Sequence, residues 1–556
     1  MQVQKRVNQI RHHLASTDTS SSLRVPHHPD LPPYMTPLNP VRFLLRSAQT
    51  YPNKVAVIDG EKKYTYATLA ERCLCLANVL LNMGIKKGDR VGILCQNLPA
   101  VVEAHYAVPA IGAITVPLNT RLASAEIEYI LNHSGTTVLL VQDIFLDQLS
   151  EKAKQHLKLI HVADSPNNPY DQTLTTGMHQ KSWYEIWVEP KETDTISVNY
   201  TSGSTGRPKG VQATYRGGYM TAIADIIHMN LTFHSVFLFT VPMFHCNGWA
   251  YPWALVATGG TQVMLAKMDY GVIWKLFEEA GVTHYGGAPT VQAEIINHSL
   301  AHRLPRPVTV MVGGSPLAGS VIKRMRALNI HPVHIYGLTE THGPSTVTYE
   351  PSIIDHLPES EQYRHLARQG HAMVVTDEMQ VVDRDTGKAV PCDGETIGEV
   401  CYTGNQLMSG YFRDPEATRV AFRNNMFWSG DLAVQHPDGT IELVDRSKDL
   451  IISGGENISS IELENTLMEL EPILECAVVA GPDDRWGERP YAFIVIKKGQ
   501  SLTDDQVIKH CRSRLAGFKC PSKIKFVDVI PRTSTGKIQK FVLRNELWKD
   551  RERRIN

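Results

Sequence analysis

The chain has 556 residues, with 56 lysines and arginines against 57 aspartates and glutamates, so its formal net charge is −1. This length predicts two or more hydrophobic cores, and the balanced charge offers no broad basic field for nucleic acid or an anionic membrane. The nine cysteines form no Cys-x-x-Cys pair, which argues against a metal or disulfide framework. The longest apolar run, residues 107–118, is too short for a bilayer, so we expect no transmembrane segment.

Residues 1–36 form an N-terminal extension with the composition of a targeting segment, basic at its start and rich in serine and threonine at residues 16–22. Within it, Arg6-Val7, five residues and then His13-Leu14 resemble the N-terminal peroxisomal import signal. A frayed helix or a mitochondrial presequence has similar chemistry. We therefore expect a peroxisomal location, with a cytoplasmic or mitochondrial one as the alternative.

Short apolar runs alternate with helical stretches over the first 190 residues, which predicts a layered α/β scaffold. One helix opens at Thr65 and closes near Gly84, and another opens at Ser124. The strand-like runs are residues 55–58, 90–95, 114–118 and 136–141.

Helical periodicity fades from His371 to about Asp445, where turns rich in Gly, Asp and Pro separate short strands. A further unit follows Arg446 and is long enough for a separate domain. It has a helix with Leu463, Leu467 and Leu470 on one face and another opened by Thr503. The predicted fold is α/β: a large domain of layered α/β subdomains (37–445) that ends in a small β-rich subdomain, followed by a mobile α+β domain (446–556).

The strongest local signal is the sequence YTSGSTGRPKG at residues 200–210, directly after the apolar Ile196 and Val198. Its glycines let backbone N–H groups approach an anion, while hydroxyl groups and a lysine add donors and charge. The Walker pattern cannot be placed on it, and the flanking strand pattern favours a phosphate loop over a Ser/Gly linker. The predicted phosphate-binding residues are Thr201, Ser202, Gly203, Ser204, Thr205, Gly206 and Lys209.

This segment resembles the phosphate loop of the acyl-adenylate-forming superfamily, which includes acyl-CoA synthetases, luciferases and peptide-synthetase adenylation domains. Further motifs of that family follow in order, and the match covers roughly residues 37–548, so chance is a poor explanation. These motifs are VGGSP at 312–316, YGLTE at 336–340, WSGD at 428–431, DRSKD at 445–449 and PRTSTGK at 531–537.

The resemblance implies a ligase that joins a carboxylic acid to AMP with release of pyrophosphate, and then transfers the acyl group to coenzyme A. Its substrates and cofactors would be a small carboxylic acid, ATP, Mg²⁺ and CoA. We expect a neutral acyl tail, because the two segments that would line the acyl pocket, residues 242–249 and 285–289, contain no lysine or arginine to pair with a second carboxylate. A medium-chain fatty acid is favoured, with a benzoate- or cinnamate-type acid as the alternative, and the oligomeric state stays open.

The family's nucleotide-binding roles fall on residues of matching chemistry. Tyr336 offers an aromatic face for adenine, Gly337 keeps the approach open, and Thr339 can donate to the α-phosphate. Glu340 corresponds to the residue that holds Mg²⁺, a hard cation that prefers oxygen ligands. The resemblance also assigns Gly314, Ser315 and Pro316 to ATP and AMP binding.

Asp431 can accept hydrogen bonds from both ribose hydroxyls, and Arg446 can add a donor. The family usually has threonine at the position of Ser429, and serine retains the hydroxyl group. Lys537, on the small domain, would stabilise the charge that accumulates as the substrate carboxylate attacks the α-phosphate.

The segment PMFHCNGW at residues 242–249 resembles the family's acyl-pocket motif, in which His245 and Trp249 would lie where the acid enters. The other predicted pocket residues are Tyr285, Gly287 and Ala288. Lys448 matches the family's hinge position. Rotation there would bring the CoA-binding residues Gly454, Gly455 and Glu456 toward the acyl adenylate.

Three other functions remain possible on sequence grounds. A peptide-synthetase adenylation domain would normally be followed by a carrier domain, but the chain ends soon after Leu547. A luciferase-type oxygenase shares the adenylation motifs. A nucleotide-binding regulatory protein without activity would be expected to lack the catalytic residues, yet Lys209, Glu340, Asp431, Arg446 and Lys537 are all present.

Overall fold

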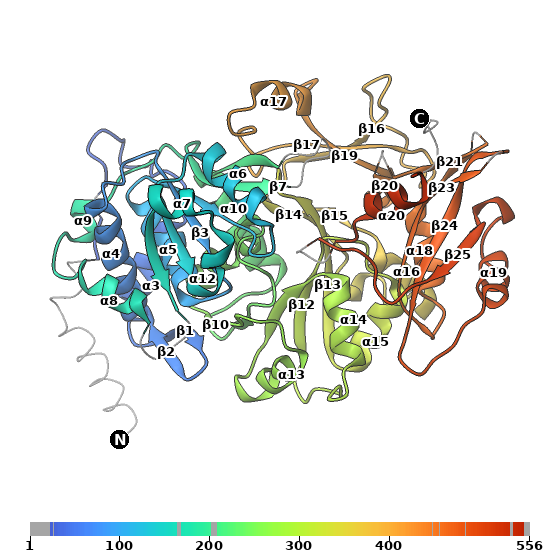
Figure 1. Cartoon of the computed structure of the whole chain (residues 1–556), viewed down its shortest axis with the longest axis horizontal. Coiled ribbons are helices and arrows are strands. Elements are labelled where there is room, and N and C mark those ends of the chain that lie inside the picture. Colours follow the sequence, from blue (N-terminus) through green and yellow to red (C-terminus); the bar gives the residue numbers. More distant parts are fainter. Residues whose placement is uncertain are drawn as a thin grey trace. The chain divides into compact units, whose positions relative to one another are not determined.

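The computed structural model describes residues 23–25, 27–163, 168–201, 208–446, 449–454, 456–483, 485–533 and 537–549 (Figure 1). The chain divides into two units, Met1–Met268 with Met408–Pro415, and Asp269–Leu407 with Glu416–Asn556. Within the described residues, no helix is both long and apolar enough to cross a membrane. The predicted domain bounds 37–445 and 446–556 stay a prediction.

The first unit contains a six-stranded sheet in the order β6-β5-β3-β4-β7-β8. All neighbouring strands are parallel except β7 and β8, which form an antiparallel hairpin. Every residue of β5 is buried, as expected for a parallel strand covered on both faces. The strands are β3 (Arg90–Leu94), β4 (Ile114–Pro117), β5 (Val138–Gln142), β6 (Lys158–Val162), β7 (Thr195–Thr201) and β8 (Lys209–Thr214). The alternation predicted from the apolar runs is confirmed.

Helices connect these strands and cover the sheet. The interior helix α5 is fully buried, which fits its nearly continuous apolar sequence. The helices are α5 (Pro99–Ala110), α6 (Ser124–Ser134), η1 (Asp143–Gln148), α7 (Glu151–His156), α8 (Pro169–Thr175) and α9 (Trp183–Ile186).

The same unit holds four more strands in the order β9-β10-β1-β2. Helix α4 begins as predicted, because the Thr65 side chain accepts a hydrogen bond from the backbone N–H of Thr68. The strands are β1 (Val55–Asp59), β2 (Lys62–Thr65), β9 (Val236–Leu238) and β10 (Thr261–Val263). The helices are α3 (Val41–Thr50), α4 (Tyr66–Asn82), α10 (Tyr215–His228), α11 (Cys246–Trp249) and α12 (Tyr251–Thr258).

In the second unit, strands β15-β14-β13-β12-β11 lie side by side in this order. β11, β12 and β13 are parallel, whereas β14 runs antiparallel to both of its neighbours. The strands are β11 (His284–Gly287), β12 (Val308–Val312), β13 (Ile330–Leu338), β14 (Gly343–Val347) and β15 (His371–Ala372). The helices are α13 (Tyr270–Glu279), α14 (Pro289–Asn297), α15 (Gly319–Ala327), η2 (Pro351–Ile353) and α16 (Glu359–Ala367).

A five-stranded antiparallel sheet follows, in agreement with the predicted β-rich subdomain. Its longest strand, β19, pairs with β17, β18 and β20. The elements are β16 (Glu378–Val382), β17 (Gly398–Thr403), α17 (Pro415–Ala421), β18 (Phe422–Arg423), β19 (Met426–Gln435) and β20 (Ile441–Arg446).

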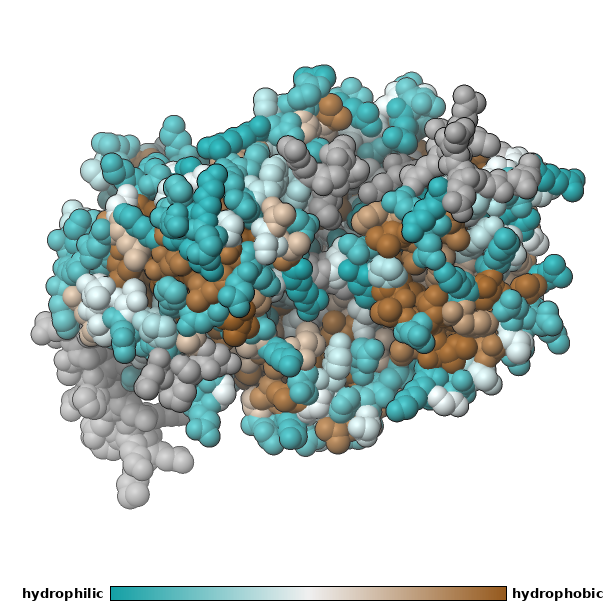
Figure 2. Space-filling view, viewed as in Figure 1, coloured by the Kyte–Doolittle hydropathy of each residue, from teal (hydrophilic) through white to brown (hydrophobic). Residues whose placement is uncertain are grey.

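The C-terminal elements form a mixed sheet with the strand order β22-β21-β24-β23, in which β25 pairs parallel to β24. Helices pack on both faces of this sheet. Leu463 and Leu467 are buried on one face with Leu470 against them, as predicted. Figure 2 shows apolar side chains over the region that Figure 1 labels α20, β24 and β25. The elements are β21 (Ile451–Ser453), β22 (Glu456–Ile458), α18 (Ser460–Leu467), β23 (Ile473–Asp483), β24 (Gly487–Ile496), α19 (Asp504–Arg512), η3 (Gly517–Lys519), β25 (Lys523–Phe526) and α20 (Lys540–Leu547).

Candidate active site

The predicted phosphate loop is the connection of the β7–β8 hairpin. Thr201, the last residue of β7, lies opposite Lys209, the first residue of β8. The intervening Ser202, Gly203, Ser204, Thr205 and Gly206 lie outside the described residues. Because β7 and β8 are paired as far as Thr201 and Lys209, the pairing holds both ends of the loop at fixed places.

The segment at residues 408–415 supports this hairpin from the side. Val211 of β8 forms an antiparallel bridge with Tyr411, and the backbone N–H of Phe412 donates to the Gly210 carbonyl over 2.7 Å. Nζ of Lys209 lies 5.0 Å from the centroid of the Tyr411 ring, within cation–π range. Tyr411 was not predicted as a site residue, because no local pattern indicates this pairing.

The predicted acyl-pocket motif lies in the same unit, after β9. His245 is partly exposed and precedes the four-residue helix α11, while Trp249 is only 6% exposed. Asn97 holds the chain that leads to His245: its Nδ2 donates to the carbonyls of Phe239 (2.9 Å) and Val241 (3.0 Å), and its Oδ1 accepts from the N–H of Met243 (2.9 Å).

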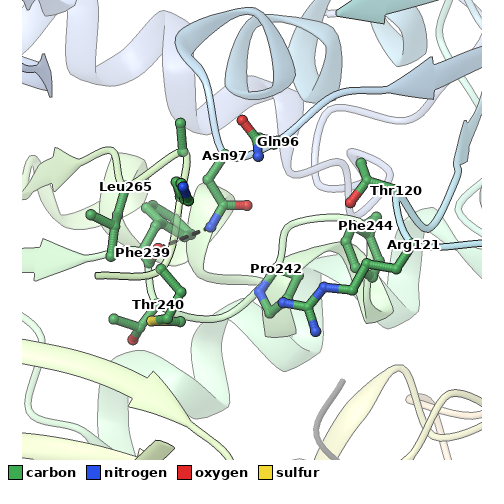
Figure 3. A pocket seen from close by; sticks show the side chains of 12 residues that line it. Gln96, Asn97, Thr120, Arg121, Phe239, Thr240, Pro242, Phe244 and Leu265 are labelled. Atoms are coloured by element: carbon green, nitrogen blue, oxygen red, sulfur yellow. Dashed lines mark hydrogen bonds between the residues drawn. The ribbon is translucent and has the colours of Figure 1, made fainter. Parts of the chain in front are cut away.

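A cavity of about 330 Å³ opens beside this motif, with Asn97, Pro242 and Phe244 in its wall (Figure 3). Two cationic side chains, Arg121 and Lys267, also line it. In Figure 3 the guanidinium of Arg121 extends in the direction of Pro242. The cavity therefore suits a ligand that carries negative charge.

In the second unit, the VGGSP segment forms the loop that follows β12. A Cβ atom at Gly313 would lie 2.1 Å from Cδ1 of Ile335, so a larger residue there would require the Ile335 side chain to move. Gly314 has φ +90°, and a Cβ atom at this position would lie 3.6 Å from Cε of Lys537. The structure thus brings the predicted catalytic lysine to the loop that also carries Ser315 and Pro316.

Two hydrogen bonds join Lys537 to Thr533. The N–H of Thr533 donates to the Lys537 carbonyl over 2.7 Å, and the N–H of Lys537 donates to Oγ1 of Thr533 over 3.0 Å. These two bonds fix where the lysine leaves the backbone. Residues 534–536 lie outside the described part of the chain.

The YGLTE segment spans the end of β13 and the turn into β14. Gly337 cannot be replaced by a larger residue without a shift, because a Cβ atom there would lie 1.9 Å from the Gly343 carbonyl oxygen. Thr339 and Glu340 are partly exposed in this turn, where the His342 N–H donates to the Thr339 carbonyl over 3.0 Å.

Glu340 is suited to a cation that is shared with phosphate groups. In the described residues no group of three or more His, Cys, Asp and Glu side chains could hold a metal by itself. Mg²⁺ commonly takes one or two carboxylates and keeps substrate phosphates and waters as its other ligands. A single carboxylate at Glu340 fits that pattern.

The side chains of Tyr336 and Arg446 both contact the carboxylate of Asp431. The Tyr336 hydroxyl donates to Oδ2 of Asp431 over 2.8 Å, and Nε of Arg446 lies 3.4 Å from Oδ1 of Asp431. Burial raises the pKa of Tyr336 well above its ordinary value, and the charge of Asp431 adds to this rise. The charge of Asp431 also raises the pKa of Arg446. The hydroxyl therefore stays protonated and remains a donor to the carboxylate.

The backbone around Asp431 is fixed by the residues before it. Gly430 has φ +79°, and its N–H donates to Oε1 of Glu399 over 2.8 Å. Ser429 accepts from the Asp431 N–H (3.1 Å) and donates to the Val400 carbonyl (2.6 Å). Ser429 thus supplies the hydroxyl that this position needs.

The remaining predicted site residues lie on β11, at the start of α14, and beside or on β21 and β22, and Gly287 of β11 pairs with Val312 of β12. Tyr285 is fully buried and donates to Oε1 of Gln292 over 2.7 Å, while Gly287 ends β11 and Ala288 caps α14. Gly454 has φ +60°, and a Cβ atom there would lie 2.5 Å from Cε3 of Trp486. Glu456 is exposed on β22. Lys448 and Gly455 lie outside the described residues.

Two family models match the chain. The model described as AMP-binding enzyme matches residues 44–412, and the model described as AMP-binding enzyme C-terminal domain matches residues 462–537.

Curated relatives match over nearly the whole chain. 4-hydroxybutyrate–CoA ligase 2 of Metallosphaera sedula is 39% identical over 94% of this chain and 97% of its own length. The peroxisomal butyrate–CoA ligase AAE11 of Arabidopsis thaliana is 39% identical, with 92% and 93% covered. The peroxisomal benzoate–CoA ligase of the same plant is 37% identical, also with 92% and 93% covered.

Solved structures share the fold. ATP-bound MatB from Rhodopseudomonas palustris has a TM-score of 0.80 and 26% identity, covering 92% of this chain and 99% of its own. The anthranilate CoA ligase AuaEII with anthranoyl-AMP has a TM-score of 0.81 and 25% identity, covering 93% and 98%. MenE from Bacillus subtilis with ATP and magnesium has a TM-score of 0.76 and 26% identity, covering 91% and 99%. The predicted α/β fold class is confirmed.

Proposed function

This chain belongs to the AMP-binding enzyme family as an AMP-forming acid–CoA ligase that uses ATP, Mg²⁺ and CoA, and we propose that its acid is a neutral aliphatic one of short to medium chain length. In the first half-reaction a carboxylate oxygen attacks the α-phosphorus of ATP and pyrophosphate leaves. In the second, the CoA thiol attacks the acyl carbonyl carbon, and AMP leaves together with the carboxylate oxygen that attacked the α-phosphorus.

The observation that carries the substrate proposal is the lack of lysine and arginine in the pocket segments Pro242–Trp249 and Tyr285–Pro289. A second carboxylate on the acid would find no cation within these two segments, and burying it unpaired against them is costly. The names of relatives support small uncharged tails, since they include butyrate, 2-methylpropanoate and 4-hydroxybutyrate ligases. The four-carbon acids in these names extend the proposal to chains shorter than the medium-chain acid expected from the sequence.

For adenylation we assign the nucleoside to Tyr336, Asp431 and Arg446, and the phosphates to the β7–β8 connection and Lys209. Asp431 has one oxygen occupied by the Tyr336 hydroxyl, so its other oxygen and the Arg446 guanidinium face the ribose hydroxyls. Thr339 donates to the α-phosphate. When bound at Glu340, Mg²⁺ neutralises charge on the phosphates.

Lys537 is assigned to the reacting groups. An ammonium held beside Gly314 can stabilise the negative charge that develops between the carboxylate and the α-phosphate. The same position blocks the thiol, so we propose that residues 446–556 rotate about Lys448 before the second half-reaction.

For the second half-reaction we assign two sets of residues to CoA. Gly454, Gly455 and Glu456 are the first set. The cavity with Arg121 and Lys267 is the second, because the phosphates of CoA need cationic partners and those of ATP are already assigned to Lys209 and the β7–β8 connection. His245 and Trp249 receive the acid.

A benzoate-type acid is the second candidate. It is favoured by the 37% identity to the benzoate–CoA ligase and by the fold shared with the anthranilate ligase. Aromatic and aliphatic tails both satisfy the requirement for an uncharged pocket.

The test is acyl-CoA formation with ATP, Mg²⁺ and CoA over acetate, butyrate, 2-methylpropanoate, hexanoate, octanoate, palmitate, benzoate, cinnamate and succinate. We expect the highest kcat/KM within the butyrate to octanoate range and none with succinate. A benzoate maximum would replace the first candidate by the second. Acyl-AMP without any thioester, or oxygen uptake with light emission, would contradict the ligase.

We also propose a peroxisomal location. The support is the Arg6-Val7-x5-His13-Leu14 pattern, which lies outside the described residues, together with relatives whose names include that organelle. Residues 1–36 fused to a fluorescent protein should label peroxisomes in eukaryotic cells, and Arg6→Glu should abolish the labelling. Mitochondrial or diffuse fluorescence of the unaltered fusion would contradict this location.

A further inference from the structure

The residues that follow His245 form a left-handed turn. Cys246, Asn247, Gly248, Trp249 and Ala250 have φ values of 42°, 47°, 61°, 54° and 60°. Four of these five residues carry a Cβ atom, which disfavours this conformation, and left-handed residues normally occur singly. Such a turn persists only when its surroundings hold it in place.

Asn247 supplies the side-chain contacts that hold the turn. Its side chain is fully buried, and its Oδ1 accepts from Oγ of Ser197 (2.9 Å) and from Nδ2 of Asn199 (2.8 Å) on β7. Its Nδ2 lies 3.1 Å from Nε2 of His105 on α5. One amide therefore connects the left-handed turn to a strand and to a helix.

The hydrogen bonds in this cluster can run in only one direction. Nδ1 of His105 lies 2.6 Å from the Val101 carbonyl oxygen, which only accepts, so the ring proton is on Nδ1. Burial lowers the pKa of His105 to about 4, so the ring is neutral at pH 7 and its Nε2 accepts from Asn247. Oδ1 of Asn247 therefore points toward β7, where Ser197 and Asn199 donate to it.

The cluster lies between two parts of the proposed site. Asn199 is two residues before Thr201, where β7 ends and the phosphate-binding connection begins. Asn247 is two residues after His245, which receives the acid. The three contacts of the Asn247 amide join the turn to β7 and α5, and directional hydrogen bonds in a buried site fix a more specific geometry than apolar packing does.

We propose that Asn247 is a positioning residue that holds His245 and the phosphate-binding hairpin in one fixed arrangement, so that the acid and ATP are bound at the correct separation. This inference rests on the proposed roles of His245 and of the β7–β8 connection. It gives Asn247 an effect on both substrates, although its side chain touches neither of the groups assigned to them.

The test compares apparent KM values in ATP–pyrophosphate exchange with butyrate. Asn247→Ala should raise the KM for the acid and the KM for ATP together, each roughly 10- to 100-fold, because small misplacements of reacting groups have effects of this size. His245→Ala should raise only the KM for the acid, and Lys209→Ala only that for ATP. The joint rise distinguishes positioning from direct binding.

Asn78→Ala is the matched control. Asn78 is also buried in the first unit, and its Nδ2 donates to the Lys181 carbonyl over 2.9 Å. Its loss should lower Tm as Asn247→Ala does but leave both KM values unchanged. Asn247→Asp, which keeps the oxygen toward β7 and loses the N–H toward His105, should raise both KM values by a smaller factor and serves if the alanine variant fails to fold.

Unchanged KM values in both Asn247 variants would overturn the inference, as would an equal rise in Asn78→Ala. Neither result would affect the proposed function, because wild-type enzyme would still form acyl-CoA. If wild-type enzyme forms neither acyl-AMP nor acyl-CoA from any acid of the panel, the proposed function itself fails.

Discussion

The hydroxyl of Tyr336 donates a hydrogen bond to Oδ2 of Asp431 over 2.8 Å, and this bond connects the residue assigned to adenine with the residue assigned to ribose. Both side chains are nearly buried. Because the carboxylate is already oriented by the phenol, the nucleoside meets a site that needs little rearrangement.

Tyr336→Phe tests that relationship. The ring stays for stacking, but Asp431 loses a donor, so the KM for ATP should rise roughly 10- to 100-fold with kcat nearly unchanged, as expected for one lost hydrogen bond to a charged group. Tyr106→Phe is the control, since Tyr106 is a buried tyrosine that donates to the Pro252 carbonyl over 2.8 Å. An unchanged KM in Tyr336→Phe would refute the assignment.

Gly314→Val tests the contact between the VGGSP loop and Lys537. A branched side chain at Gly314 meets Cε of Lys537 and also strains a backbone with φ +90°. Adenylation, measured by pyrophosphate exchange, should fall at least about 100-fold, as expected when a group that stabilises developing charge is displaced.

Lys537→Ala should abolish the same exchange while CoA still reacts with supplied acyl-AMP. Equal loss of both half-reactions in either variant would contradict the division of roles between adenylation and thioester formation.

Removal of the two cations of the cavity in Figure 3 tests their assignment to CoA. Arg121→Ala and Lys267→Ala should each raise the KM for CoA roughly 2- to 5-fold, as expected for solvent-exposed charge pairs, and leave the KM for ATP unchanged. The exposed Lys152 of α7 provides the control variant Lys152→Ala. If the KM for ATP rises and that for CoA does not, the cavity belongs to the other substrate.

Three buried histidines predict how stability depends on pH. Burial lowers the pKa values of His105, His334 and His342 from 6.5 to about 4. Since the unfolded chain takes up protons at a higher pH than the folded chain, this part of the stability is fully present above pH 6.5 and is lost as the pH falls to about 4.

Urea unfolding at several pH values between 7 and 4 should show this decline. His334→Gln should reduce the slope, because one of the three buried histidines with a lowered pKa is removed. A flat profile, or equal slopes in wild type and His334→Gln, would contradict the prediction.

Much of the fold follows from local patterns. The alternation of apolar runs and helices and the Thr65 and Thr503 caps appear in the structure where the sequence predicts them, because periodicity and capping depend on neighbours in the chain. The motifs also predicted that Tyr336, Asp431 and Arg446 bind one nucleotide; the structure shows that Tyr336 and Arg446 both contact Asp431, and the binding role stays a prediction.

Other features depend on contacts between distant residues. The pairing of Tyr411 with β8 and the approach of Lys537 to Gly314 join segments that are far apart in the sequence. The left-handed turn at Asn247 lies inside a motif that was recognised, but its backbone contradicts local preference and needs Ser197, Asn199 and His105. No window of sequence contains these contacts.

An AMP-forming ligase activates the acid as an acyl adenylate before the acyl group reaches CoA. The most direct test uses butyrate labelled with ¹⁸O in its carboxylate, together with ATP, Mg²⁺ and CoA, and mass spectrometry of the products. We expect one labelled oxygen in AMP and none in pyrophosphate, because the attacking oxygen stays on the α-phosphorus. Unlabelled AMP, or label in inorganic phosphate with ADP as the product, would contradict it.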